Sequence, residues 1–259
     1  MPEREIPAFI PDWSLPAGVS ALQTLRGLGQ PPYGGFNLGD HVGDDLASVD
    51  ANRKALALEI AATPVWLNQV HGVAVHEATE HNLGQPVVAD AVFTTTPGLA
   101  CTIMTADCLP VLIADRVGGI VGAAHAGWRG LVSGVLPALV NQMLQAVALE
   151  PEDLSVWLGP AIGPEAFEVG AEVLNAFVAL DVRHQAFFKQ HPESPEKYLA
   201  DLPRLAAVSL RRLGITDITL SGLCTVTQPA HWYSYRREGV TGRMASLIWI
   251  NPSAASGVL

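Results

Sequence analysis

Short apolar runs separated by turn residues dominate the chain from about residue 65 onward. Between residues 65 and 128, apolar and β-branched runs alternate with Gly, Pro, Asp and Asn, a pattern typical of β-strands. Runs of the same kind return nearer the C-terminus. The predicted strands are 65–67, 73–75, 91–94, 99–104, 109–113, 120–124, 154–158, 215–220 and 244–250.

Longer apolar segments between these strands predict helices over 50–62, 131–148, 171–180 and 203–213. Pro137 is expected to kink or restart the second of them. The turn-rich segment 31–45 cannot hold a regular helix and is expected to be loop. The polar segment 181–197 is a candidate for a mobile flap. This order of strands and helices, without internal repeats, predicts a mixed α/β (α+β) fold in a single domain over 1–259.

The composition narrows the class of protein. Of the 259 residues, 49% are apolar and 15% are charged, which is typical of a folded globular chain. The net charge of −10 argues against a nucleic-acid partner. An anionic substrate would therefore have to meet a local cluster of arginines.

Targeting signals are not evident either. Three cysteines are too few for a secreted disulfide scaffold and favour reduced thiols. The first sixteen residues carry charge and four prolines where an export signal needs an apolar run. The uncharged segment 130–149 is long enough to span a bilayer, but its polar residues gather on one helical face. We expect a cytoplasmic protein with no membrane partner.

Three residues able to bind a metal stand where predicted strands begin or end. They are His71, Cys108 and His125, each beside small or turn-forming residues. Two imidazoles and a thiolate suit zinc, and three protein ligands leave a fourth position for water or substrate. A zinc-bound water loses its proton near neutral pH and becomes a nucleophile. The pattern predicts an enzyme with one catalytic zinc ion.

The residues alone leave alternatives open. Cys108 and His125 would also serve as a metal-free nucleophile and base, with Asp107 as an orienting group. A fourth ligand such as His41 or Cys224 would instead close the site and make the metal structural. The remaining cysteines and histidines are expected to be ordinary core or surface residues.

Around these positions the sequence resembles the laccase-domain family, also called the multicopper polyphenol oxidase-like family. The resemblance lies in blocks 67–72, 89–91, 104–112 and 124–130, and continues through 37–39, 42–44, 52–53, 158–163, 167–170, 234–237 and 241–246. It implies a single-domain α/β/β/α sandwich with mixed sheets, with zinc on the three residues named above. It also implies phosphorolysis of adenosine, inosine and methylthioadenosine to the free base and ribose 1-phosphate, and deamination of adenosine. Bacterial members are further linked to amide hydrolysis that edits peptidoglycan precursors.

The family's older name claims copper-dependent oxidation of polyphenols. The chain has eight scattered histidines and no His-x-His pair, whereas a four-copper oxidase needs about ten histidine ligands, often in His-x-His pairs. A four-copper centre is therefore excluded by this count. Copper could still replace zinc as a single ion, since Cu(II) binds such ligands more tightly.

The nucleoside chemistry assigns roles to further residues. Phosphate as co-substrate would bind Arg129, the arginine nearest the triad in sequence, with Arg236, Arg237 and Arg243 adding positive charge. A carboxylate must move protons during deamination, and Asp107 and Glu168 are the candidates. Asn37 is a candidate for binding ribose, and Phe36, Trp128 or Tyr235 for stacking on the base. The predicted catalytic residues are Cys108, His125, Arg129 and Asp107, and the predicted substrate-binding residues are Asn37, Arg129, Arg236 and Glu168.

Amide hydrolysis would use the same residues, through zinc hydroxide or through Cys108 with His125 as its base. The motif therefore does not separate the two chemistries. The expected partners are small molecules, and the expected state is a monomer or small homo-oligomer.

Overall fold

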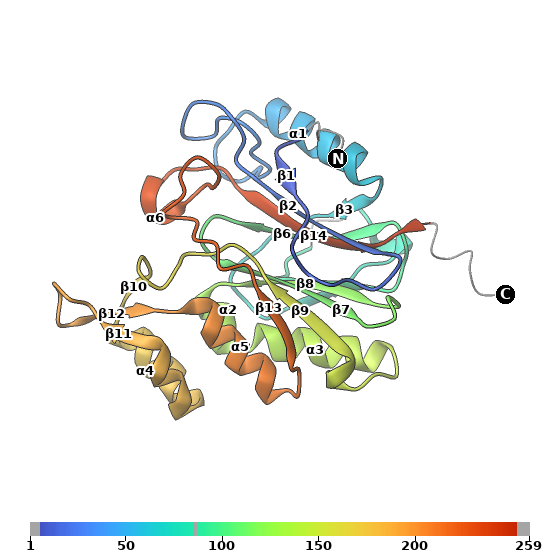
Figure 1. Ribbon diagram of the computed structural model, residues 1–259. Coiled ribbons are helices and arrows are strands. Elements are labelled where there is room, and N and C mark those ends of the chain that lie inside the picture. The colour runs from blue at the N-terminus through green and yellow to red at the C-terminus, as the bar shows by residue number, and fades with distance from the viewer. Residues whose placement is uncertain (1–5, 85–86, 253–259) are drawn as a thin grey trace.

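Two β-sheets lie face to face at the centre of the protein, with helices on their outer sides (Figure 1). The computed structural model describes residues 6–84 and 87–252. Two predictions fall partly outside the described residues. The stretch in which no export signal was expected begins with residues 1–5, and the domain expected over 1–259 includes both ends of the chain.

The first sheet has five strands in the order β1-β2-β14-β6-β3. All its neighbours are antiparallel except β3 and β6, which run parallel. The bounds are β1 Ala8–Phe9, β2 Val19–Thr24, β3 Thr63–Val65, β6 Leu99–Thr105 and β14 Met244–Ile250.

The second sheet has six strands in the order β13-β9-β7-β8-β5-β4, parallel at its two edges and antiparallel between them. Its bounds are β4 Val75–Glu77, β5 Ala91–Thr94, β7 Leu109–Asp115, β8 Val121–Ala126, β9 Leu154–Leu158 and β13 Asp217–Leu220. A small third sheet has the order β10-β12-β11, from β10 Glu168–Gly170, β11 Phe188–Gln190 and β12 Lys197–Ala200.

Helix α1 covers the outer face of the first sheet, and most other helices lie on the far side of the second (Figure 1). The bounds are α1 Leu46–Ile60, α2 Trp128–Ser133, α3 Val135–Ala146, α4 Ala171–Leu180, α5 Leu202–Arg212 and α6 Tyr235–Glu238. Short 3₁₀ turns cover Glu80–Asn82, Pro151–Asp153 and Val182–Phe187. Across residues 6–84 and 87–252, none of these helices combines the length and apolar character needed to span a bilayer.

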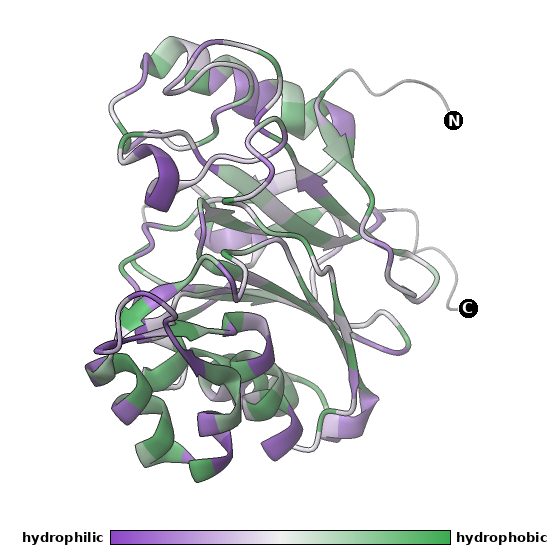
Figure 2. Ribbon diagram, turned by 60° about the vertical axis from the view of Figure 1, so that its left-hand side comes forward, coloured by the Kyte–Doolittle hydropathy of each residue, from purple (hydrophilic) through white to green (hydrophobic). Residues whose placement is uncertain are grey.

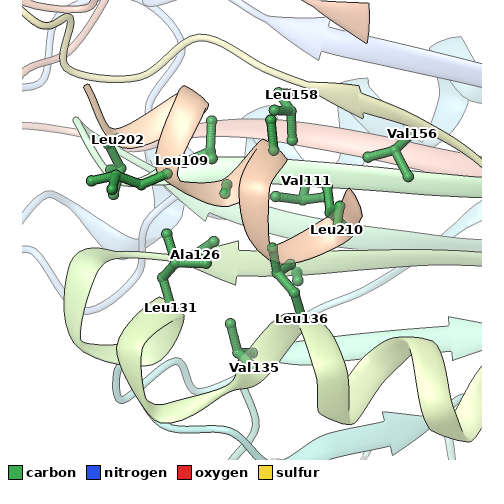
Figure 3. Packing of buried hydrophobic residues seen from close by; sticks show 14 of the residues in the cluster. Leu109, Val111, Ala126, Leu131, Val135, Leu136, Val156, Leu158, Leu202 and Leu210 are labelled. Carbon is green, nitrogen blue, oxygen red and sulfur yellow. The ribbon is translucent and has the colours of Figure 1, made fainter. Parts of the chain in front are cut away.

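The alternation of side chains along the buried strands explains the layers. In β7, Leu112 and Ala114 point to the core between the sheets, while Val111 and Ile113 pack under the helices. Figure 3 shows this second core, where Val111 and Leu109 meet side chains of α2, α3 and α5. Both faces of the central strands are buried, so these strands consist largely of apolar residues (green in Figure 2). Hydrophilic residues lie mainly on the outer sides of the helices.

Most predicted elements are present. Strands 91–94, 154–158 and 244–250 and helix 171–180 have the predicted bounds, and the segment 31–45 is loop. The helix predicted over 131–148 breaks at Gly134, which has a φ of 98°, and not at Pro137. Pro137 lies in the first turn of α3, where its missing N–H breaks no helical hydrogen bond. The polar segment 181–197 forms a 3₁₀ turn and strand β11.

Candidate metal centre and active site

Strand pairing brings the three predicted metal ligands together. Cys108 stands in the turn that joins β6 to β7, and His125 is in β8, where it pairs with Pro110 of β7. His71 lies in the loop between β3 and β4. The ligand atoms of the three residues all lie within 4.8 Å of one another. Among the described residues this is the one cluster of three or more such side chains.

The spacing fits a tetrahedral ion. Zinc–nitrogen and zinc–sulfur bonds of ordinary length place the two ligand atoms about 3.6 Å apart across a tetrahedral angle. The His71 Nε2 atom is 3.7 Å from the Cys108 Sγ atom. The His71 and His125 rings meet edge to face with centroids 4.7 Å apart. His41 and Cys224, the alternative fourth ligands, are not in the cluster, which fits an open site.

Charge coupling within the triad favours the thiolate. Burial alone would raise the pKa of Cys108, but the neighbouring His125 and His71 lower it to about 6. Burial would lower the pKa of His125, but Cys108 and the buried carboxylate of Asp90 raise it instead. The two neighbouring histidines thus favour the thiolate form of Cys108. Thiolate is the form of cysteine that binds metal ions.

A cavity of about 560 Å³ opens onto the triad. This is the size of a small-molecule site. Its wall combines the three candidate metal ligands with cationic, aromatic and apolar side chains. The lining residues are His41, Gln69, His71, Met104, Thr105, Ala106, Asp107, Cys108, His125, Trp128, Arg129, Ile162, Phe167, Leu202, Tyr235, Arg236 and Arg243.

Three of the arginines named from the sequence line this cavity. Arg129 is exposed and stacks on the Trp128 ring at 4.6 Å, with no carboxylate partner in the described part of the chain. Arg236 is held by the backbone carbonyls of Ala166 and Glu168. Arg243 bonds the carbonyls of Thr241 and Gly242. None of these three arginines forms an ion pair with a carboxylate of the described residues, so the cavity gathers cationic side chains in an acidic protein.

The fourth arginine has a different role. Arg237 points away from the cavity lining and bonds the carbonyls of Thr225, Val226 and Trp232. It also pairs with Glu238 at 3.0 Å. It holds the chain around α6 in place.

The carboxylate of Asp107 is fully engaged in hydrogen bonds. Its Oδ1 accepts the hydroxyl of Thr225 at 2.6 Å. Its Oδ2 accepts the hydroxyl of Ser234 at 3.0 Å and the backbone N–H of Arg236 at 2.7 Å. With a φ of 97° and 8% exposure, Asp107 is a structural anchor beside Cys108, an arrangement that does not suit the proton-carrying role considered from the sequence.

Two predicted substrate-binding residues lie outside the cavity lining. Asn37 is fully buried, and its amide bonds Gly39, Asp44 and the backbone N–H of Arg243, so ribose cannot reach it. Glu168 lies on the third sheet, paired with Lys197 at 2.5 Å and with His191 at 3.4 Å. Phe36 is buried in the core under α1, so only Trp128 and Tyr235 of the three proposed stacking residues face the cavity.

Two residues that hold the site together through contacts distant in sequence were not predicted from the sequence. Gln69 lines the cavity and bonds both the N–H and the C=O of Met104, each at 2.8 Å. Asp90 is fully buried and contacts two of the candidate metal ligands, at the backbone N–H of His71 and at the side chain of His125. Both lie inside the sequence blocks noted above, but no local pattern shows what their side chains contact.

Known proteins are similar over nearly the whole chain. The family model described as multi-copper polyphenol oxidoreductase laccase matches residues 20–251. The protein of Escherichia coli named purine nucleoside phosphorylase YfiH is 48% identical over 249 residues, covering 93% of this chain and 98% of that protein. A Pseudomonas aeruginosa protein, also named a purine nucleoside phosphorylase, is 48% identical over 242 residues, covering 93% and 97%.

Solved structures agree with the fold. A crystal structure of a Neisseria meningitidis protein, described by the family name DUF152, has a TM-score of 0.87 and 41% identity, covering 94% of this chain and 99% of that one. The crystal structure of YlmD from Geobacillus stearothermophilus has a TM-score of 0.85 and 31% identity, covering 91% and 93%. The chain therefore belongs to the multi-copper polyphenol oxidoreductase laccase family.

Proposed function

We propose that the protein is a zinc-dependent purine nucleoside phosphorylase that converts adenosine, inosine and methylthioadenosine to the free base and ribose 1-phosphate. The proposal rests on one observation: the cavity that contains the His71, Cys108 and His125 cluster is also lined by three arginines that form no ion pair with a carboxylate of the described residues. The names of the relatives at 48% identity point to the same chemistry.

In phosphorolysis a phosphate oxygen forms a bond to C1′ of the ribose while the bond from C1′ to the base nitrogen breaks. The base leaves with that electron pair and takes up a proton. Arg129 and Arg243 would hold the phosphate dianion and orient it, since fixed cations in a recessed site cost no reorganisation. Trp128 and Tyr235 offer aromatic faces to the base.

The ligand set fits zinc better than a copper oxidation centre. One thiolate and two imidazoles at this spacing match the three nitrogen, sulfur or oxygen ligands that a catalytic zinc site uses. Bound there, zinc would supply an activated water, which suits deamination of adenosine as a second activity. Amide hydrolysis is the alternative, through zinc hydroxide or through Cys108 as nucleophile with His125 as its base, since their ligand atoms lie within 4.8 Å of each other. Copper-dependent phenol oxidation would use a single substituted ion.

The test is one assay on protein with quantified metal. Adenosine is supplied with and without phosphate, and adenine, inosine and hypoxanthine are separated by chromatography. Adenine that forms only with phosphate supports the phosphorylase. Inosine formed without phosphate supports deamination, and turnover of amide substrates alone would replace the proposal with the hydrolase.

A further inference from the structure

Asp90 is a buried carboxylate that takes no part in the proposed phosphorolysis. It directly precedes β5, is fully buried, and lies behind the metal cluster rather than in the cavity wall. Two different parts of the site converge on its two oxygen atoms. One is the loop that carries His71, and the other is the side chain of His125.

The loop side forms a backbone nest. Three consecutive N–H groups donate to the Asp90 carboxylate, from Val70 at 3.1 Å, His71 at 2.9 Å and Gly72 at 2.7 Å. The middle residue, His71, has a φ of 60°, a left-handed conformation that is unfavourable for a residue with a side chain. Successive N–H groups around such a residue form an anion-binding concavity. The negative charge of Asp90 therefore stabilises the backbone conformation that aims His71 at the cluster.

The strand side fixes the second histidine. The Asp90 Oδ1 atom is 2.8 Å from Nδ1 of His125, and the backbone carbonyl of Asp90 accepts the His125 N–H at 2.7 Å. Since an ionised carboxylate can only accept, Nδ1 must carry the proton. Nε2 of His125 is then left with its lone pair free for a metal ion.

We infer that Asp90 is the positioning residue of the metal site, and that its one carboxylate sets the loop conformation of His71 and the tautomer of His125 together. The inference rests on the metal site of the proposed function but not on its substrate. Cys108 is held separately, by the turn that Asp107 anchors. Two of the three ligands thus depend on a group that contacts neither metal nor substrate.

The variant Asp90→Asn separates this role from simple packing, because the amide has nearly the same shape. With its carbonyl oxygen toward His125, its NH₂ group faces the N–H groups of Val70 and Gly72, where both partners are donors. In the flipped orientation its NH₂ group donates to Nδ1 of His125, which moves the ring proton to Nε2 and blocks the metal position. Each orientation therefore disrupts either the loop conformation of His71 or the tautomer of His125.

The experiment titrates the full metal-free chain with Co(II) and follows the thiolate-to-cobalt absorption and the cobalt ligand-field bands. We expect Asp90→Asn to bind Co(II) about 10- to 100-fold more weakly than the wild type, with an altered ligand-field spectrum. The matched control is Asp115→Asn, because Asp115 is also a buried carboxylate that accepts a backbone N–H, from Ile120, at the opposite end of β7. It should bind Co(II) like the wild type.

The outcomes separate the claims. An Asp90→Asn protein that folds, and matches the wild type in affinity and spectrum, overturns the positioning role alone. A wild-type chain that takes up no Co(II) overturns the metal site and this inference with it. A second measurement needs no variant: nitrogen NMR of the zinc-loaded wild type, labelled in histidine, should show His125 bound through Nε2 with a protonated Nδ1. Binding through Nδ1 would overturn the inference.

Discussion

The carboxylate of Asp107 accepts the backbone N–H of Arg236 at 2.7 Å, across 129 positions of sequence. This bond joins the turn before Cys108 to the start of α6. A metal ligand and a cationic residue of the cavity wall are thus tied to the same carboxylate, together with Thr225 and Ser234.

Asp107→Asn should therefore lower stability more than it alters chemistry. An amide cannot accept all three hydrogen bonds, and hydrogen bonds to a charged group contribute about 1.5–3 kcal/mol each. We expect the free energy of unfolding to fall by about 2 kcal/mol, measured by urea denaturation. A double-mutant cycle with Thr225→Val should show coupling, because the two side chains bond at 2.6 Å. A protein of unchanged stability whose kcat falls about 100-fold would instead make Asp107 a proton carrier.

Gly127 has no room for a side chain. A Cβ atom there would stand 2.9 Å from Sγ of Cys108 and 3.0 Å from Cδ2 of His71. Any residue can adopt the φ of −62° that Gly127 has, so Gly127→Ala tests this contact without backbone strain. We expect metal affinity to fall about tenfold in a zinc competition assay. Gly119→Ala, where the nearest atom is 3.6 Å away, is the control, and equal affinity of both variants would contradict the expectation.

The sequence carries strong signals for the parts of the site that lie on strands. Strands predicted over 109–113 and 120–124 place Cys108 and His125 at their ends, and the observed β7 and β8 pair there. Apolar runs bounded by turn residues define such strands locally. The same pattern delimits the loop after β3 that holds His71, but no short motif joins His71 to the other two residues, so the prediction of the triad rests on the family resemblance.

Other features depend on distant contacts and leave no local pattern. Asp90 reaches His125 across 35 positions, and Gln69 reaches Met104 across the same separation. Asn37 stands in a glycine-rich loop, where such a side chain can bind a ligand or cap its own turn. In the structure Asn37 caps its own turn, because its side-chain Oδ1 accepts the backbone N–H of Gly39. The strands of the third sheet are three or four residues long, too short for a period to emerge.

Arg129 is the arginine expected to act on phosphate. Arg129 is exposed in the cavity wall, and its guanidinium stacks on Trp128. A hydrogen bond to a charged group contributes about 1.5–3 kcal/mol, so Arg129→Gln should reduce kcat/KM for phosphate about 10- to 100-fold. Zinc content should not change, because Arg129 is not a ligand. Steady-state kinetics with varied phosphate make the measurement. Arg116→Gln, on the exposed turn after β7, is the control, and parity between the two variants would remove Arg129 from the phosphate site.

Glu238, the last residue of α6, should make stability depend on pH. Burial raises the pKa of this carboxyl, but the hydrogen bond from Thr241 and the charges of Arg237 and Arg26 hold it below its ordinary value of 4.5. A carboxyl whose pKa is lower in the folded state stabilises the fold above 4.5 and loses this contribution as the pH falls through the folded value. Urea denaturation should therefore show Glu238→Gln less stable than the wild type by about 1.5 kcal/mol at neutral pH, with the difference shrinking in acid. Glu152→Gln, on an exposed turn, should leave stability unchanged at both pH values. A Glu238→Gln difference that is constant with pH would show that the carboxylate's charge does not hold α6 in place.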